Sequence, residues 1–234
     1  MGRRFAVAQN ENPHDRFPRL LVCEGHEDKF FFHHLIRERD LPSFHIWPSS
    51  GNGGFANAIR AFRAGRTKQY NALRNILIVA DNDENPAASF SNVCDHIEQL
   101  FGSGTRPSAP LEKTKTRPIA VTVLMIPWTD VNGHLERLCI ESATEADKAI
   151  AGHVQTFMDL IFADRWASES RRGKAWLRTN LAARCSRDPF VPLGEVFRED
   201  QYRHLIPLNH RSFDRIADVL ASFAPAGGAV QPAS

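Results

Sequence analysis

The sequence predicts an α/β protein built on a four-stranded parallel β-sheet with helices on both faces and a helical C-terminal extension. Three observations predict this fold. Segments with helical spacing separate the strands, and such alternation produces parallel sheets. The 234 residues are enough for one such domain with an extension. Four short runs are almost continuously apolar, as strands buried on both faces are, and they cover residues 19–24, 44–47, 75–80 and 119–126.

Helices are expected after each of the first three strands. Residues 26–39 place Phe31 and Leu35 four positions apart, which is the spacing of one helix face. Asn85 followed by Pro86 is typical of a helix start, because asparagine caps the first turn and proline suits the first helical position. The helix after the second strand is marked by Phe55, Ile59 and Phe62.

Beyond residue 131 the pattern changes to helices alone. Short helical patterns cover residues 133–140, 172–187 and 213–223, and Ser142 with Glu145 has the spacing of a capping box ahead of a further helix. We therefore expect four segments: a flexible arm at 1–17, an α/β core at 18–131, a helical extension packed on the core at 132–223, and a disordered tail at 224–234.

Composition excludes several classes of protein. Lys and Arg total 29 against 27 Asp and Glu, so the net charge of +2 argues against a wholly basic nucleic-acid coat. No apolar stretch approaches the roughly 20 residues of a membrane helix, so no membrane partner is expected. The four cysteines stand far apart without Cys-x-x-Cys spacing, which argues against a disulfide framework and favours a reducing, cytoplasmic setting.

Acidic residues follow two of the predicted strands. Glu24 ends the first strand, Asp28 lies four residues later, and Asp81 and Asp83 follow the third strand. Reactive groups of parallel sheets gather at the carboxyl ends of the strands. If the strand continues in extended form, Asp81 and Asp83 face one way. Carboxylates this close repel one another unless a hard cation such as Mg²⁺ neutralises them, which indicates metal-assisted phosphoryl or phosphodiester transfer.

The segments LLVCEGHED, ending at Asp28, and LIVADND, ending at Asp83, resemble a TOPRIM domain. TOPRIM domains occur in topoisomerases, bacterial primases, RecR-type recombination proteins and OLD-family nucleases. The glycine-rich segment 50–54 between the motifs is similar to a loop of that family, and the resemblance spans residues 19–126. It implies a Rossmann-like sheet with Glu24 as general acid–base or metal-bound carboxylate, and with Asp81 and Asp83 as Mg²⁺ ligands.

The Glu24–Asp28 spacing is more similar to OLD-type nucleases, and the fragments GHLE and KAWL look like a small stand-alone TOPRIM-like group. The OLD pattern has a further acid and a later lysine, for which Glu136 and Lys174 are the candidates. The chain departs from that family because it contains no phosphate-binding GxxxxGK[ST] motif of an ATPase. Topoisomerase activity is disfavoured because the only tyrosines are Tyr70 and Tyr202, without a separate domain to carry the nucleophile.

These observations lead to one main hypothesis: a Mg²⁺- or Mn²⁺-dependent nuclease acting on DNA or RNA. Its catalytic candidates are Glu24, Asp28, Asp81, Asp83 and Lys174, and its metal ligands are the same four acids with Glu136. Two basic runs, 60–74 with five cations and no acid, and 165–187 with seven cations and one acid, are the candidate phosphate-binding segments.

Two alternatives stay open. The chain fits a non-catalytic TOPRIM-like module that binds nucleic acid or a protein partner, as RecR-type proteins do, and a separate ATPase is one such partner. A phosphoryl-acceptor domain is the other, with Thr129 as the threonine such domains place after a later strand. The sequence does not distinguish DNA from RNA, and it leaves the oligomeric state open.

Overall fold

The computed structural model describes residues 18–49, 54–114, 118–128, 130–166 and 168–224. Within them lies a four-stranded sheet in the order β2-β1-β3-β4, with every neighbouring pair parallel. The predicted fold class is confirmed, and the strand bounds differ from the predicted ones by a residue. The strands are β1 (Arg19–Cys23), β2 (His45–Pro48), β3 (Asn75–Asp81) and β4 (Ala120–Ile126).

Helices cover both faces of the sheet, because alternate residues of each buried strand are apolar on both sides. On one face, Leu20 and Val22 of β1 pack against α2 (Phe55–Gly65) and α4 (Pro86–Phe101). On the other, Leu21 joins a larger cluster with α1 (His26–Glu38). As predicted, the Asn85 side chain caps α4 by accepting a hydrogen bond from Ala88 N at 3.1 Å.

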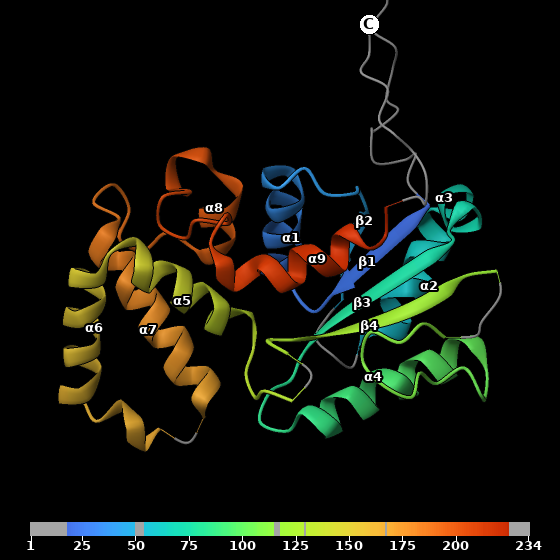
Figure 1. Ribbon diagram of the computed structural model, residues 1–234, viewed down its shortest axis with the longest axis horizontal. Helices are drawn as coiled ribbons and strands as arrows, with labels where there is room; N and C mark the ends of the chain where they lie inside the picture. Colours follow the sequence, from blue (N-terminus) through green and yellow to red (C-terminus); the bar gives the residue numbers. More distant parts are fainter. Residues whose placement is uncertain (1–17, 50–53, 115–117, 129, 167, 225–234) are drawn as a thin grey trace, which may run out of the picture.

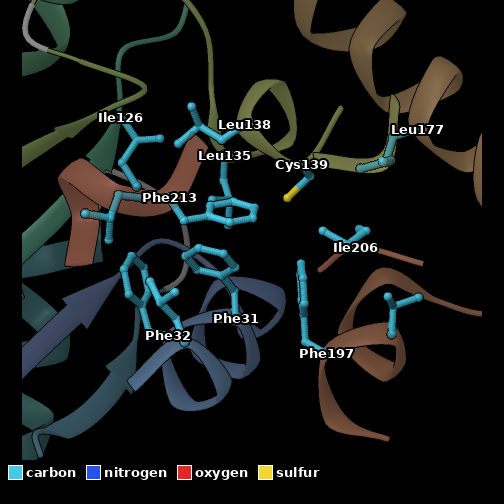
Figure 2. Close-up of a cluster of buried hydrophobic side chains, with 14 of the residues drawn as sticks. Phe31, Phe32, Ile126, Leu135, Leu138, Cys139, Leu177, Phe197, Ile206 and Phe213 are labelled. Carbon is cyan, nitrogen blue, oxygen red and sulfur yellow. The ribbon is translucent and has the colours of Figure 1, made fainter. Parts of the chain in front are cut away.

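The C-terminal helices extend this larger cluster beyond the sheet. Figure 1 shows α5 to α7 lying past the end toward which β3 and β4 point, and α9 running across the face that α1 covers. Figure 2 shows Phe31 and Phe32 of α1 meeting Phe197 and Phe213 in one buried core. The helices are α5 (Leu135–Ala146), α6 (Lys148–Leu160), α7 (Glu169–Arg184), α8 (Leu193–Arg198) and α9 (Asp214–Ala221).

One predicted helix start is wrong. Ser142 does not cap a helix but lies buried inside α5, where its hydroxyl donates to Pro207 O at 2.9 Å. The cap of α6 is Asp147, whose carboxylate accepts from Ile150 N at 3.0 Å. The capping-box spacing was present, but the packing of α5 against the C-terminal segment overrides this local preference. The short helices α3 (Thr67–Ala72) and α8 were not predicted, because neither spans two full turns of periodic residues.

Some predictions concern residues outside the described ranges: the arm at 1–17, nearly all of the tail at 224–234, most of the glycine-rich segment 50–54, and Thr129. The boundary between core and extension stays a prediction. All four cysteines are buried free thiols. In the described part of the chain, no helix has the length and apolar character needed to cross a membrane.

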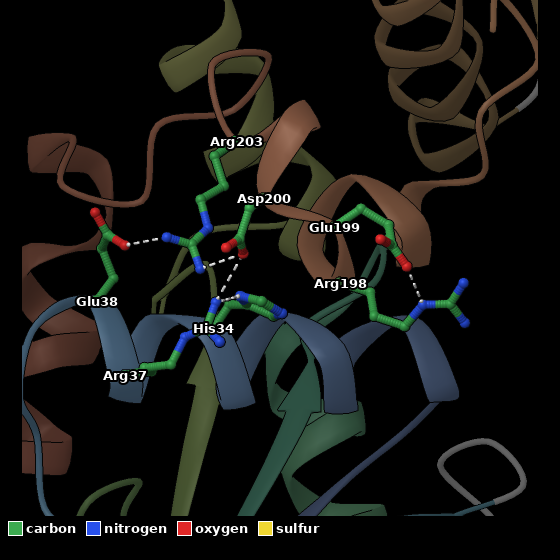
Figure 3. Close-up of polar contacts among 7 residues, drawn as sticks. All are labelled: His34, Arg37, Glu38, Arg198, Glu199, Asp200 and Arg203. Atoms are coloured by element: carbon green, nitrogen blue, oxygen red, sulfur yellow. Dashed lines mark hydrogen bonds and ion pairs between the residues drawn. The ribbon is translucent and has the colours of Figure 1, made fainter.

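Ion pairs and hydrogen bonds join α1 to the C-terminal segment at the surface. In Figure 3, Arg203 contacts Glu38 at 3.4 Å and Asp200 at 2.6 Å, and Arg37 contacts Asp200 at 3.2 Å. Arg39 is more buried. Its guanidinium donates to Leu208 O at 2.8 Å and to two further acceptors at 2.7 Å, His210 O and the carboxylate of Asp214.

We expect Arg39→Ala to lower the free energy of unfolding by about 2–3 kcal/mol, because it removes three charge-assisted bonds and leaves two carbonyls without this donor. The matched control is Arg37→Ala in the last turn of α1, two residues before Arg39. Its partner Asp200 is largely exposed, and the loss of Arg37 should cost about 0–1 kcal/mol. Chemical denaturation of both variants measures the difference. Equal losses would show that Arg39 does not hold the extension to α1.

Candidate metal-binding acidic site

The carboxyl ends of β1 and β3 bring Glu24 and Asp81 together. Since β1 and β3 are neighbours in register, the residues that follow them lie side by side. The backbone N–H of Asp81 donates to Oε1 of Glu24 at 3.0 Å. This hydrogen bond crosses 57 positions of sequence and fixes the direction of the Glu24 side chain.

Asp28 joins them through the first turn of α1. The N–H of Gly25 donates to Oδ2 of Asp28 at 2.8 Å, so the chain turns tightly between β1 and the helix. The positive end of the helix dipole favours a carboxylate here. The turn thus returns Asp28 to the edge where Glu24 lies, as the sequence predicted.

Asp81 also contacts the extension. Its Oδ1 accepts a hydrogen bond at 3.2 Å from the backbone N–H of Leu135, the first residue of α5. The same residue therefore uses its backbone N–H for Glu24 and its carboxylate for the start of a helix that follows β4. Asp81 is the junction between the sheet edge and the extension.

The extended alternation predicted for residues 81–83 ends at Asn82. Asp83 adopts a left-handed backbone with φ of 49° and exchanges hydrogen bonds with Gly133 at 2.9 and 2.8 Å. Asp83 is exposed, whereas Asn82 is fully buried. The Asn82 amide donates to Trp128 O and, at 2.7 Å, to Val131 O, so it binds the loop after β4 to the end of β3.

Glu136 and Lys174 come from the extension and meet at the same edge. Glu136, in the first turn of α5, lies 3.5 Å from Nζ of Lys174 on α7. On its other side, Nδ1 of His134 lies 2.9 Å from Oε2 of Glu136. His134 packs against Gly173, where an added Cβ would come within 3.1 Å of the ring. The sequence pattern did not single out His134 or Asn82 as residues of the site. The only signal was their position beside acids already singled out.

Burial and neighbouring carboxylates shift the pKa values of the acids at this edge. Burial, with Asp28 and Asp83 nearby, raises the pKa of Glu24 to about 7. Burial, with Glu136 and Glu27 nearby, raises that of Asp28 to about 6. Burial and four neighbouring carboxylates raise the pKa of Asp81 well above its usual range. Glu136 is the exception: burial disfavours its charge, but His134 and Lys174 hold its pKa below the ordinary value.

The donor set suits a hard divalent cation. Glu24, Asp28 and Asp81 each use one oxygen to accept a backbone N–H, and within the described residues the second oxygen makes no hydrogen bond. An all-oxygen set of carboxylates is what Mg²⁺ prefers. However, the side chains do not already form a metal-binding arrangement. In the described ranges, no group of three His, Cys, Asp or Glu side chains could hold a metal ion as it stands. A cation would have to draw them closer.

The two basic runs are largely engaged elsewhere. In the first run, Arg74 precedes β3 and bonds the carbonyls of its own turn, so it lies away from the acidic edge formed by Glu24, Asp28 and Asp81. In the second run, five of the seven side chains contact other parts of the protein. Among the described residues of this run, Lys174 is the one paired with an acid of the site, Glu136. The five are Arg165, Arg172, Lys174, Arg184 and Arg187.

The fold and this edge define an α/β protein with a parallel sheet whose carboxyl end gathers partly buried carboxylates. The chain belongs to the family described as "Protein of unknown function (DUF3226)", whose model matches residues 18–224. No curated protein and no solved structure gives a significant match to the chain.

The raised pKa values predict that the metal-free protein loses stability with rising pH. A carboxyl whose pKa is higher in the folded state binds more protons there than in the unfolded chain, so its folded state is favoured at low pH. Stability falls as pH rises from about 4.5, the ordinary value, to about 7, the pKa of folded Glu24. Thermal denaturation with a chelator present, between about pH 5 and pH 8, should show the melting temperature falling.

Glu24→Gln should flatten this dependence and raise the melting temperature at the alkaline end, because glutamine carries no charge. Glu141→Gln is the matched control, since Glu141 is an exposed acid on α5. A wild-type melting temperature that rises over the same interval would contradict the predicted repulsion.

Proposed function

We propose that the chain cleaves phosphodiester bonds of nucleic acid with the help of Mg²⁺ or Mn²⁺ bound at the acidic edge. The observation that carries the proposal is that Glu24, Asp28 and Asp81 are each held by one backbone N–H while the second oxygen lacks a hydrogen bond within the described residues. Groups held in place with unused acceptor atoms and mutual repulsion favour a cation. The resemblance of residues 19–126 to TOPRIM domains supports the same assignment.

The residues divide into metal-holding and substrate-facing roles. Glu24, Asp28, Asp81 and Asp83 would hold the cation, with Glu136 at the margin of the site. A bound divalent ion neutralises phosphate charge and makes water more acidic. Lys174 is half-exposed and offsets the negative charge of Glu24, Asp28 and Glu136, so it is placed to bind a phosphate oxygen. His134 keeps Glu136 ionised and oriented.

Asp81→Asn and Glu24→Gln should each reduce cleavage by about 10²-fold or more, since each removes a charge that the metal requires. The measurement is cleavage of end-labelled DNA and RNA, single-stranded and duplex, with Mg²⁺ or Mn²⁺. Glu141→Gln is again the control and should keep wild-type activity. Folding is checked by thermal denaturation, and the two site variants should melt no lower than wild type at alkaline pH. Equal cleavage by wild type and both site variants would falsify the assignment.

Lys174→Ala should slow cleavage by about 10-fold or more, with Lys174→Arg recovering part of the rate because it keeps the charge. The matched control is Arg178→Ala, one turn further along α7 and exposed. The rates should depend on salt more weakly for Lys174→Ala than for wild type, because one phosphate contact is gone. A Lys174→Ala rate equal to that of Arg178→Ala would confine Lys174 to its ion pair with Glu136.

One observation favours the alternative of a non-catalytic module that binds nucleic acid or a protein partner: the described carboxylates do not form a ready-made cluster of three ligands. Titration calorimetry separates the two proposals. A catalytic site binds Mg²⁺ or Mn²⁺ in wild type and loses binding in Asp81→Asn. A module without metal chemistry gives no heat of metal binding in either protein, yet still binds its partner.

A further inference from the structure

The outer edge of the sheet carries a cavity that the acidic site does not use. It has a volume of about 490 Å³ and runs along Phe44 and residues 45–47 of the edge strand β2, between α1 and α2. Among the described residues β2 pairs only with β1, so its other side meets no strand. A span of four extended residues is about 13 Å. This length suits a flexible chain lying in the groove better than a compact small molecule.

The charge of the cavity wall is one-sided. Lys29, Arg37, Arg66 and Arg198 line it, and no Asp or Glu does in the described ranges. Two of these cations form ion pairs with acids that do not line the cavity: Arg37 contacts Asp200 at 3.2 Å, and Arg198 contacts Glu199 at 3.0 Å. The other two cations that line the wall are Lys29 and Arg66.

Aromatic rings lie between these cations. Trp47 is half-buried on β2, and its ring meets Phe62 edge-on at 5.4 Å between centroids. Phe30 lines the end of the cavity near Arg198, whose guanidinium lies 5.9 Å from the ring. Cationic grooves with aromatic side chains are typical of single-stranded nucleic-acid binding, because the phosphates are neutralised while the bases stack.

The groove leads to the acidic edge. Lys29 directly follows Asp28 in α1, and β2 ends beside Glu24, where Ser49 Oγ donates to Glu24 O at 3.3 Å. Arg66 follows the end of α2 and lines the cavity together with Phe44, which precedes β2. A chain in the groove would therefore run from Arg66 past Trp47 to Lys29 and reach the carboxylates. An added β-strand from a protein partner is less favoured, because β2 is short and Pro48 lacks a backbone donor.

We propose that this groove binds a single-stranded segment of nucleic acid and leads it to the acidic edge. The part of the inference that leads the bound strand to the acidic edge rests on the proposed function. The binding of the strand in the groove does not. DNA and RNA share the base and phosphate chemistry that the groove recognises, so the test includes both.

The test is fluorescence anisotropy of labelled oligothymidine and oligouridine in EDTA, where no metal-dependent cleavage occurs. Lys29→Ala with Arg66→Ala should weaken binding about 10-fold or more and lower the salt slope by about two. The matched control is Lys113→Ala with Lys148→Ala, two exposed cations that lie outside both basic runs and do not line the cavity. The control should change affinity less than about twofold. Equal weakening in both double variants, or no binding by wild type, overturns the proposal.

A second readout locates the bases. Binding should quench tryptophan fluorescence in wild type, and Trp47→Phe should lose most of this quenching while keeping the fold and most of the affinity. Quenching that persists in Trp47→Phe places the bases elsewhere.

Failures of the two proposals are distinguishable. If Glu24→Gln and wild type bind single strands alike and neither cleaves, the groove stands and the nuclease proposal falls. If wild type cleaves and the Lys29 and Arg66 double variant cleaves with unchanged KM, the nuclease stands and the groove falls.

Discussion

The hydrogen bonds at the end of β3 hold this structure together. The N–H of Asp81 binds Glu24 after β1, its carboxylate binds Leu135 at the start of α5, and the next residue, Asn82, binds the loop after β4. Two successive residues thus connect both neighbouring strands and the extension. The amide nitrogen of Asn82 and Oδ1 of Asp81 both have hydrogen-bond partners, which matters because unpaired polar groups in such a place are costly.

The same arrangement has an electrostatic consequence. Holding Glu24, Asp28 and Asp81 at one edge places like charges close together, and burial together with this repulsion raises their pKa values. The amino ends of α1 and α5 and the single ammonium of Lys174 offset part of it. The remainder is what a hard cation would relieve. Perturbed groups of this kind mark functional sites more often than purely structural ones, and this makes the edge the candidate centre of the molecule.

The sequence could predict the sheet because burial on both faces leaves a direct mark, an almost continuous apolar run such as that ending at Ala80. It could also predict that acids following neighbouring strands meet. It could not predict the left-handed turn at Asp83, which depends on pairing with Gly133, 50 residues away in sequence. Ser142 shows the same limit, because its capping-box spacing is overridden by packing against Pro207. Local patterns determine elements here, and long-range contacts determine their ends.

The central claim is that the carboxylates at the ends of β1 and β3 bind a divalent metal ion. The most direct test is a crystal structure with Mn²⁺, located by its anomalous scattering. We expect a peak bound by oxygens of Glu24 and Asp81, with these side chains moved to ligand distances, which are about 2.0–2.1 Å for Mg²⁺. A map at saturating Mn²⁺ with no peak at this edge, and with the carboxylates unmoved, would contradict it.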